Sequence, residues 1–345
     1  VNLTAKLGVS FDNPDVDSPN GLHHYGGPTW LGEDECMLIP DRYDIWKLDP
    51  DGKSAVCLTK GEGRRKGLQF RVMGLDALED SHWYQQIRHR PLKGSIRLSV
   101  FDENTMEYGF GRMNTAAPAV PEYFTEPVMF KGVSKVEGND LIAYQKGDFR
   151  HPYDVYITRD FFTSSDKLTA VNPQMSQYLW GDAHLVSWTA YDGTPLKGIL
   201  YTPENLDPNG SYPMVVYFYE KNTQNLFSPS SPAPSRSVIN YAYYVSNGYV
   251  VFVPDIVYKT GHPGESAFNC ICSGAEAMCD QFKFIDRNRM GIQGQSWGGY
   301  QVAYLVTRTD MFVCGGAGAP VGNMTSAYGG IRWGTGRSRI SQYEH

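Results

Sequence analysis

The feature that most constrains this chain is a serine placed between two glycines, in the sequence Gly-Gln-Ser-Trp-Gly at residues 294–298. This Gly-x-Ser-x-Gly pattern is typical of a nucleophile elbow, a strained turn between a strand and a helix that exposes the serine hydroxyl. Residues 289–293 have the character of a short strand, and residues 300–308 have apolar side chains at helical spacing. The sequence therefore predicts a strand, a tight turn and a helix, with Ser296 as the candidate nucleophile. A serine that only caps the helix is the alternative.

Composition narrows the classes of partner. The chain has 345 residues, enough for two domains with a sizeable core. Its formal net charge is −6 and it has no block of Lys or Arg, which disfavours nucleic acid as a partner. No apolar stretch approaches the roughly 18 residues that a membrane-spanning helix needs. No group of His, Cys and carboxylate residues has the spacing of metal ligands, so the sequence predicts neither a metal nor a cofactor.

The six cysteines are predicted to be free, buried thiols. None of them forms a Cys-x-x-Cys pair, which disfavours a metal or redox site. Cys272 and Cys279 lie on one face of a predicted helix, where a small apolar residue fits the core.

Residues 1–172 contain many short runs of β-type residues separated by turns. Three similar units begin near residues 43, 95 and 153, and the first and third lead through a turn to the related sequences Cys-Leu-Thr and Lys-Leu-Thr. Repeats of this size, each made of several short strands, suit the blades of a β-propeller. The sequence predicts an all-β domain at residues 1–172 that forms a partial β-propeller of about three to four blades. An ordinary β-sandwich is the alternative.

After a boundary at residues 171–174 the pattern changes to that of an α/β domain, residues 173–345. An Asp-Gly turn between two alternating runs predicts a β-hairpin. Continuous apolar runs, separated by stretches of helical periodicity, predict parallel strands that are buried on both faces. The predicted strands are 183–189, 195–201, 213–219, 249–253, 289–293 and 312–317, and a long helix is predicted at 264–283. This alternation predicts a doubly wound, mostly parallel sheet with a ligand at the carboxyl ends of its strands.

The residues around the serine also resemble a known family. Residues 286–300, together with 212–219, 247–251 and 319–321, resemble the prolyl oligopeptidase family of serine peptidases, in particular its dipeptidyl-peptidase-IV-like and acylaminoacyl-peptidase-like branches. The resemblance implies a β-propeller followed by an α/β-hydrolase domain. It also implies a hydrolase that carries out proteolysis of short peptides through an acyl-enzyme on Ser296, with a peptide as its substrate.

The same resemblance implies roles for individual residues. Ser296 would be the nucleophile, and the hydroxyl of Tyr219 and the backbone N–H of Trp297 would form the oxyanion hole. Donors that are fixed in advance stabilise the charge that develops on the carbonyl oxygen, by roughly 3–4 kcal/mol for one donor. Tyr300, beside the nucleophile, would line the substrate pocket. A tyrosine of the hydrophobic core is the alternative for both Tyr219 and Tyr300.

The sequence departs from this family in its catalytic triad. In an α/β-hydrolase the aspartate and the histidine follow the serine, after later strands. The 49 residues after Ser296 (345 − 296 = 49) contain one aspartate, Asp310, and one histidine, His345. Asp310 lies at the predicted end of the helix that follows the elbow, and His345 has no strand before it, so neither is expected to complete the triad. We expect the triad Asp and His to lie outside this chain, which is interpreted as an inactive fragment with a truncated α/β-hydrolase domain.

A second departure concerns peptide specificity. Dipeptidyl-peptidase-IV-like enzymes hold the free amino terminus of the substrate with two adjacent glutamates on the propeller, and this chain has no Glu-Glu pair. The nearest candidates are Glu122 and Glu126, for which solvated carboxylates are the alternative. We therefore predict a serine-type peptidase without assigning dipeptide release. Other interpretations of the chain are a catalytically dead fragment, a propeller binding module and an esterase-type serine hydrolase.

Overall fold

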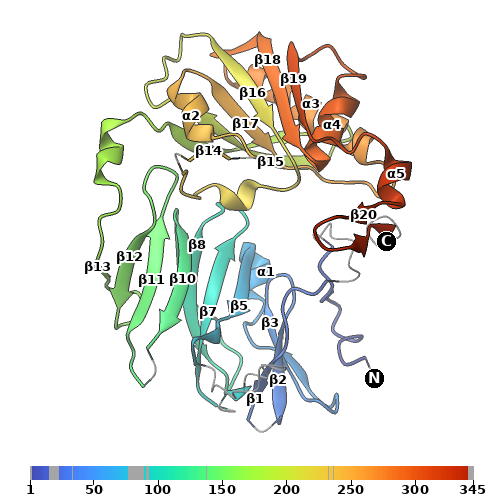
Figure 1. The fold of residues 1–345 in the computed structure, drawn as a ribbon. Coiled ribbons are helices and arrows are strands. Elements are labelled where there is room, and N and C mark those ends of the chain that lie inside the picture. The colour runs from blue at the N-terminus through green and yellow to red at the C-terminus, as the bar shows by residue number, and fades with distance from the viewer. Residues whose placement is uncertain are drawn as a thin grey trace. The chain divides into compact units, whose positions relative to one another are not determined.

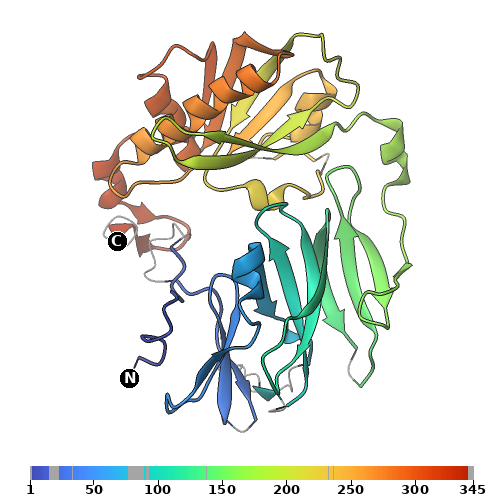
Figure 2. The same cartoon turned by 180° about the vertical axis from the view of Figure 1, so that it is seen from behind.

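The computed structural model describes residues 2–14, 23–32, 34–76, 89–90, 93–136, 138–231, 233–235 and 237–340. The chain divides into two compact units. The first comprises Val1–Gln145, Val155–Leu168 and Tyr328–His345, and the second comprises Lys146–Asp154 and Thr169–Ala327. Figures 1 and 2 show the elements of each unit from opposite sides.

The described part of residues 29–167 forms three sheets of short strands, with the orders β4-β3-β2-β1-β6, β5-β7-β8-β9 and β10-β11-β12-β13. The strands are β1 Thr29–Leu31, β2 Cys36–Pro40, β3 Ile45–Leu48, β4 Ala55–Cys57, β5 Leu68–Val72, β6 His89–Arg90, β7 Ser95–Asp102, β8 Tyr108–Asn114, β9 Glu122–Glu126, β10 Met129–Lys135, β11 Ile142–Gly147, β12 Asp154–Thr158 and β13 Asp166–Lys167. Short helices α1 (Glu62–Lys66) and η1 (Gly74–Asp76) lie between strands. The units predicted near residues 43, 95 and 153 fall in one sheet each, on β3, β7 and β12.

The first and third predicted units share one strand arrangement. Strand β3 pairs with β4 so that Trp46 lies opposite Cys57, and β12 pairs with β13 so that Tyr156 lies opposite Lys167. Both partners are displaced along the chain by the same interval (156 − 46 = 110 and 167 − 57 = 110). The weak repeat in the sequence is therefore a repeat in the strand register as well.

A buried aspartate at the start of each of these strands makes the same bond. Thr59 Oγ1 donates to the Asp44 carboxylate at 2.6 Å, and Thr169 Oγ1 donates to the Asp154 carboxylate at 2.7 Å, each across 15 residues. Both carboxylates also accept a backbone N–H. A buried charge is costly unless it is hydrogen-bonded. These contacts therefore explain why the repeats at β3 and β12 both contain the aspartate and the threonine.

The second unit contains a six-stranded sheet with the order β14-β15-β17-β16-β18-β19. β14 and β15 form an antiparallel hairpin, β15 pairs with β17 in the antiparallel sense, and β17, β16, β18 and β19 are parallel neighbours. The strands are β14 Asp182–Thr189, β15 Pro195–Thr202, β16 Tyr212–Tyr217, β17 Val250–Pro254, β18 Ile285–Gln295 and β19 Cys314–Gly318. The strands that the sequence predicts here are all present. The apolar runs indicated them correctly because strands such as β17 are buried along their whole length.

Helices cover both faces of this sheet. The long helix α3 (Pro263–Gln281) packs with α4 (Trp297–Leu305) and against β14, β17 and β18, whereas α2 (Tyr241–Ser246) packs against β15 and β17. α2 lies in front of the sheet in Figure 1 and α3 lies in front of it in Figure 2. The remaining short elements are η2 Pro173–Gln177, η3 Thr223–Asn225, α5 Met324–Tyr328, β20 Ile331–Arg332 and β21 Arg337–Ser338. Within the described residues, none of the helices is long and apolar enough to cross a bilayer.

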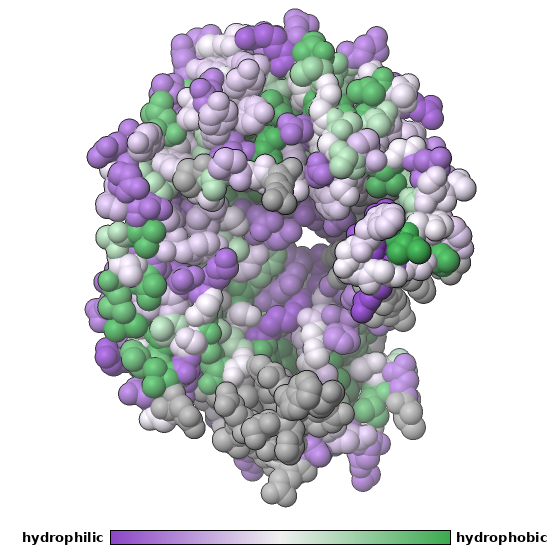
Figure 3. Space-filling model, in the orientation of Figure 1, coloured by the Kyte–Doolittle hydropathy of each residue, from purple (hydrophilic) through white to green (hydrophobic). Residues whose placement is uncertain are grey.

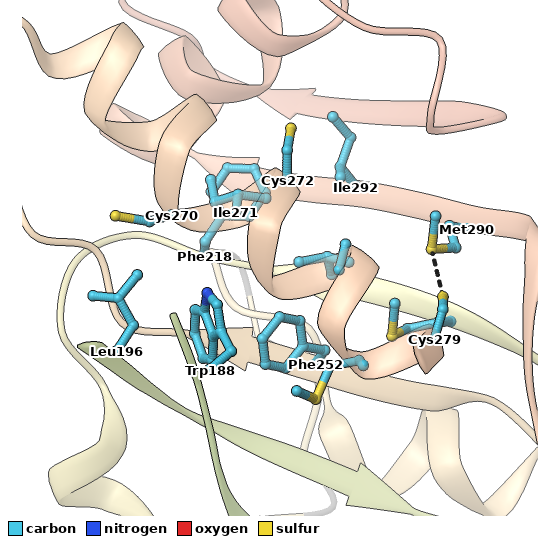
Figure 4. Close-up of a cluster of buried hydrophobic side chains, with 14 of the residues drawn as sticks. Trp188, Leu196, Phe218, Phe252, Cys270, Ile271, Cys272, Cys279, Met290 and Ile292 are labelled. Atoms are coloured by element: carbon cyan, nitrogen blue, oxygen red, sulfur yellow. Dashed lines mark hydrogen bonds between the residues drawn. The ribbon is translucent and has the colours of Figure 1, made fainter. Parts of the chain in front are cut away.

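The core on the α3 side of the sheet is built from large apolar side chains (Figure 4). Phe218 and Phe252 are fully buried there, and the indole N–H of Trp188 donates to Ser273 Oγ at 3.1 Å. α3 approaches the sheet closely because Gly274 has no side chain: a Cβ there would lie 2.9 Å from ring atoms of both Phe252 and Trp188. This packing fixes β16 and β17, whose carboxyl ends lead into the candidate site described below.

On the other face of the sheet, α2 packs against β15 and β16 through aromatic side chains. The rings of Tyr201 and Tyr241 are stacked with centroids 4.6 Å apart, and Tyr217 meets Tyr241 edge-on at 5.9 Å. Asn240 caps the start of the helix, and its side-chain oxygen accepts the N–H of Tyr243 at 3.0 Å. Burial raises the pKa of both Tyr201 and Tyr241. α2 is absent from the sequence prediction, because six residues carry too little periodicity to indicate a helix.

The prediction of free thiols is confirmed for all six cysteines. Burial is confirmed for Cys36, Cys270, Cys272 and Cys279 and is wrong for the half-buried Cys57 and for Cys314, which is exposed on β19. On α3, burial raises the pKa of the Cys270 thiol to about 11 and that of the Cys272 thiol to about 12. These two thiols therefore have a packing role.

Cys270 and Cys272 should resist alkylation in the folded protein. At pH 8 a thiol with a pKa near 11 or 12 is thiolate to about one part in 10³ to 10⁴, against roughly a quarter for a free cysteine. Iodoacetamide labelling followed by peptide mass spectrometry should find both residues unmodified until denaturant is added. Rapid labelling of either one in native protein would contradict their burial.

Apolar side chains also reach the surface of the strand region. In Figure 3 they gather over β11–β13, at the left of the view. Leu168, directly after β13, is 56% exposed. Because β13 is the last strand of its sheet, this apolar surface lies along a sheet edge.

Candidate active site

Ser296 stands alone between a strand and a helix. β18 ends at Gln295 and α4 begins at Trp297, so the helix starts three residues earlier than the sequence indicates. The backbone of Ser296 has φ 58° and ψ −108°, a conformation that a residue with a side chain rarely adopts. Such strain costs of order 1–3 kcal/mol and persists only where the surrounding structure imposes it. The hydroxyl makes no capping bond to α4, so the capping alternative does not account for this serine.

The strand register brings Tyr219 to the same edge as Ser296. In the parallel pair β16 and β18, Tyr217 lies opposite Gln293, and the N–H of Phe218 donates to the Gln293 carbonyl at 3.4 Å. Two residues further along each strand are Tyr219 and Gln295, and Ser296 follows. Because parallel strands end at one edge of a sheet, residues that are separated by 77 positions (296 − 219 = 77) are neighbours here.

Three glycines let the backbone segments around Ser296 approach closely. A Cβ on Gly298 would lie 2.5 Å from the carbonyl oxygen of Phe218, and a Cβ on Gly299 would lie 2.5 Å from that of Gly318. A Cβ on Gly294 would clash with the backbone of Gly298. None of the three has a positive φ. These positions therefore need glycine for lack of space, as the sequence pattern predicts.

Gly298→Ala should disturb both stability and geometry. Its Cβ would meet a backbone oxygen that cannot turn aside, and overpacking of this kind costs about 1–3 kcal/mol. We expect a lower Tm and a displaced β16 end, which carries Tyr219. Gly322→Ala is the matched control, because nothing lies within 4 Å of a Cβ at that position. Equal melting temperatures for the two variants would contradict the close approach.

Ser296 and Tyr219 line the same pocket, of about 500 Å³. Tyr217, Lys221 and Tyr241 are among the other lining residues. Tyr219 is 41% exposed, which does not fit the alternative of a core tyrosine. No histidine is among the described residues that line the pocket.

Trp297 and Tyr300 lie next to the serine on α4. As the first residue of the helix, Trp297 has a backbone N–H without a partner inside the helix. Its ring stacks on that of Tyr300, with centroids 4.9 Å apart and an angle of 23° between the planes. Tyr300 is half-buried and burial raises its pKa, and it is not among the residues that line the Ser296 pocket.

Asp255, which sequence reasoning missed, holds the loop that follows Tyr219. It comes directly after β17, and its carboxylate accepts the N–H of Asn222 at 2.5 Å, the N–H of Thr223 at 3.0 Å and the Thr223 hydroxyl at 2.5 Å. Burial raises the pKa of Asp255, and these hydrogen bonds oppose that shift. The carboxylate thereby anchors η3 and one wall of the pocket.

The other residues considered from the sequence lie elsewhere. Asp310 is exposed beyond the end of α4, and His345 lies outside the described residues. Glu122 and Glu126 stand at the two ends of β9, and Glu122 is paired at 2.7 Å with Arg112 in an exposed ion pair. Among the described residues, no three His, Cys, Asp or Glu side chains could hold a metal ion together.

The fold and the site together define a class of protein, one in which an α/β sheet unit presents a serine on a strained strand-to-helix turn. Residues 235–339 match the model of the prolyl oligopeptidase family, a family of serine peptidases. The chain is 31% identical to dipeptidyl peptidase 8 of Mus musculus over 152 residues, which cover 40% of this chain and 16% of that protein. The resemblance to the prolyl oligopeptidase family is therefore confirmed.

Solved structures resemble a larger share of the chain. A putative dipeptidyl aminopeptidase IV from Bacteroides ovatus aligns with a TM-score of 0.60 at 15% identity, over 86% of this chain and 44% of that one. An acylaminoacyl peptidase from Pyrococcus horikoshii aligns with a TM-score of 0.58 at 15% identity, over 89% of this chain and 47% of that one. Such neighbours combine a propeller with an α/β-hydrolase domain. The chain thus spans less than half the length of the proteins that it matches.

Proposed function

We propose that the natural protein carrying this chain is a serine peptidase that cleaves short peptides through an acyl-enzyme on Ser296. The observation that carries the proposal is the strained backbone of Ser296 at the end of β18, with its side chain on a pocket that Tyr219 shares. The match of residues 235–339 to a family of serine peptidases supports the same reaction.

The chemistry follows from the positions of three groups. Ser296 Oγ would attack the carbonyl carbon of the scissile bond, and the electron pair of the C=O bond would move to its oxygen. The Tyr219 hydroxyl and the Trp297 N–H would donate to that oxyanion, where preorganised donors have their largest effect. Collapse of the tetrahedral intermediate would expel the amine and leave the acyl-enzyme, which water then hydrolyses.

The serine also needs a base to accept its proton and an acid to protonate the leaving amine. In the family pattern a histidine oriented by an aspartate does both. Asp310 is exposed beyond α4, which supports the expectation that it takes no part. We propose that both triad partners come from residues other than those described around the pocket.

We further propose that residues 1–172 form part of a β-propeller and residues 173–345 the corresponding α/β-hydrolase domain. The shared register and the shared aspartate–threonine bond of the units at β3 and β12 support repeated blades. A propeller on the same chain as the catalytic domain would limit substrates to short peptides. The prediction that Tyr300 lines the substrate pocket is not part of this proposal, because Tyr300 is not among the residues that line the Ser296 pocket.

A substrate panel tests this function. The natural protein would be assayed on aminoacyl, dipeptidyl and acylaminoacyl p-nitroanilides and, in parallel, on p-nitrophenyl esters. We expect turnover of at least one class of anilide, lost in Ser296→Ala. Turnover of esters alone would indicate an esterase, and turnover of neither would indicate a binding module; either result contradicts the proposal.

A further inference from the structure

We propose that Tyr258 and Gln301 form a clasp that positions the two oxyanion donors, Tyr219 and Trp297, relative to each other. The clasp is the Tyr258 hydroxyl together with the Gln301 carboxamide. The inference rests on the proposed function, because it concerns how the same site is held. It makes Tyr258 and Gln301 positioning residues that act through the donors.

The Tyr258 hydroxyl is the centre of the clasp. It donates to the backbone carbonyl of Tyr219 at 2.9 Å and accepts the indole N–H of Trp297 at 3.1 Å. It also accepts a hydrogen bond from the Gln301 side-chain amide. A hydroxyl has one donor and two acceptor positions, and these three bonds fill them all. One phenol thereby connects Tyr219, two residues beyond the end of β16, with two residues of α4.

The Gln301 amide reinforces the same connection. Its Nε2 also donates to the Tyr219 carbonyl, at 3.2 Å, so that carbonyl accepts two bonds from the clasp. Gln301 is fully buried, and among the described residues its Oε1 has no hydrogen-bond partner. An unpaired buried oxygen is destabilising, whereas an apolar side chain at this place would avoid that cost. A glutamine kept here for packing alone is therefore hard to explain, and its two donated bonds account for it.

The hydrogen bonds of the clasp are made to the backbone carbonyl of Tyr219 and to the indole of Trp297, the two residues that carry the proposed donors. Two bonds to one carbonyl set the peptide plane of Tyr219 and hence the direction in which its side chain leaves the backbone. The third bond, from the indole N–H to the Tyr258 hydroxyl, holds the side chain of Trp297, whose backbone N–H is the other proposed donor. Tyr219 is 41% exposed, and its ring passes beside Gly298, 3.7 Å from the position of a Cβ there. Its anchorage therefore comes mainly from the backbone.

Positioning at this precision has a kinetic consequence. Oxyanion donors act when they lie about 2.7–3.1 Å from the position of the developing charge. A displacement of about 1 Å can cost on the order of 10²-fold in rate. Loss of the clasp should therefore lower kcat while leaving substrate binding nearly unchanged, because the donors act in the transition state.

Tyr258→Phe in the natural protein tests the clasp, since it keeps the ring and removes the hydroxyl. We expect kcat to fall by roughly 10- to 10²-fold with KM within about twofold. Tyr212→Phe is the matched control: its hydroxyl accepts one backbone N–H, from Asp207 at 2.8 Å, at the opposite end of β16. An unchanged kcat in Tyr258→Phe, or an equal loss in both variants, would overturn the inference.

A double-mutant cycle separates positioning from a merely structural role. If Tyr258 acts through the phenol of Tyr219, Tyr258→Phe should change kcat far less in a Tyr219→Phe background than in the wild type. The same fold-loss in both backgrounds would assign Tyr258 to structure alone.

If Tyr258→Phe lowers Tm strongly, Gln301→Met is the second variant. It removes two of the bonds without removing buried volume, and the same double-mutant cycle applies to it. If Ser296→Ala is active, the proposed function fails; if it is inactive and Tyr258→Phe behaves like the wild type, only the clasp fails.

Discussion

Replacing Ser296 by alanine in the natural protein should lower kcat by about 10⁴- to 10⁶-fold, with the fold retained. The hydroxyl is the atom that would form the covalent bond, and an alanine side chain has no nucleophilic atom at that position. The strained backbone at φ 58° does not depend on the hydroxyl, because the glycines and strands around it impose the turn. The variant should therefore melt at or slightly above the wild-type temperature.

Ser246→Ala serves as the control for that experiment. Ser246 is exposed at the end of α2, where its hydroxyl donates to the Tyr243 carbonyl at 2.9 Å. We expect its kcat to equal that of the wild type. If Ser296→Ala kept activity within tenfold of the wild type, Ser296 would not be the nucleophile.

Tyr219→Phe should lower kcat by about 10²- to 10³-fold, the loss expected for one oxyanion donor. KM should change little, since the hydroxyl contributes most when charge has moved to the carbonyl oxygen. The ring would still fill its place beside Gly298, so the fold should be unaffected. Tyr243→Phe, a change at a 65% exposed tyrosine on α2, should leave kcat unaltered. A rise in KM with unchanged kcat would instead make Tyr219 a ground-state binding residue.

The sequence predicts the sheet well because its signal is local. β17 is a continuous apolar run and is buried along its whole length, and the Asp-Gly turn predicts the hairpin of β14 and β15. Boundaries are less predictable. β18 begins at Ile285, four residues before the start of the predicted strand (289 − 285 = 4), in a stretch where its register with β16 is irregular. The sequence predicts the start of α4 too late, since glycine has a low helix propensity and the helix actually begins at Trp297. Gly298 and Gly299 occur there because the neighbouring backbone leaves no space for a side chain.

The elements that the sequence does not predict depend on tertiary packing. α2 has only six residues, and it is held by Tyr241 against Tyr201 and Tyr217, which lie 40 and 24 positions away (241 − 201 = 40 and 241 − 217 = 24). The exposure of Cys314 follows from its place on the outermost strand of the sheet, β19. No window of the sequence contains such information.

The candidate site divides in the same way. Ser296 is predicted because the glycines that define an elbow are its neighbours in the chain. Tyr258 and Asp255 are missed because their partners are distant: Trp297 is 39 residues from Tyr258, and Asn222 is 33 residues from Asp255. The sequence does contain one signal for them: both residues follow the predicted buried strand 249–253. Functional groups often lie at the carboxyl ends of parallel strands, so this position could have indicated a role in the site.

Covalent labelling of Ser296 tests the central claim most directly. A fluorophosphonate probe would be added to the natural protein, and the modified residue would be located by peptide mass spectrometry, with Ser296→Ala as the blank. We predict one label on the peptide that contains residues 294–298, formed in parallel with the loss of peptidase activity and absent from the variant. A protein that hydrolyses peptides but carries the label elsewhere, or carries none, would contradict the assignment of Ser296 as its nucleophile.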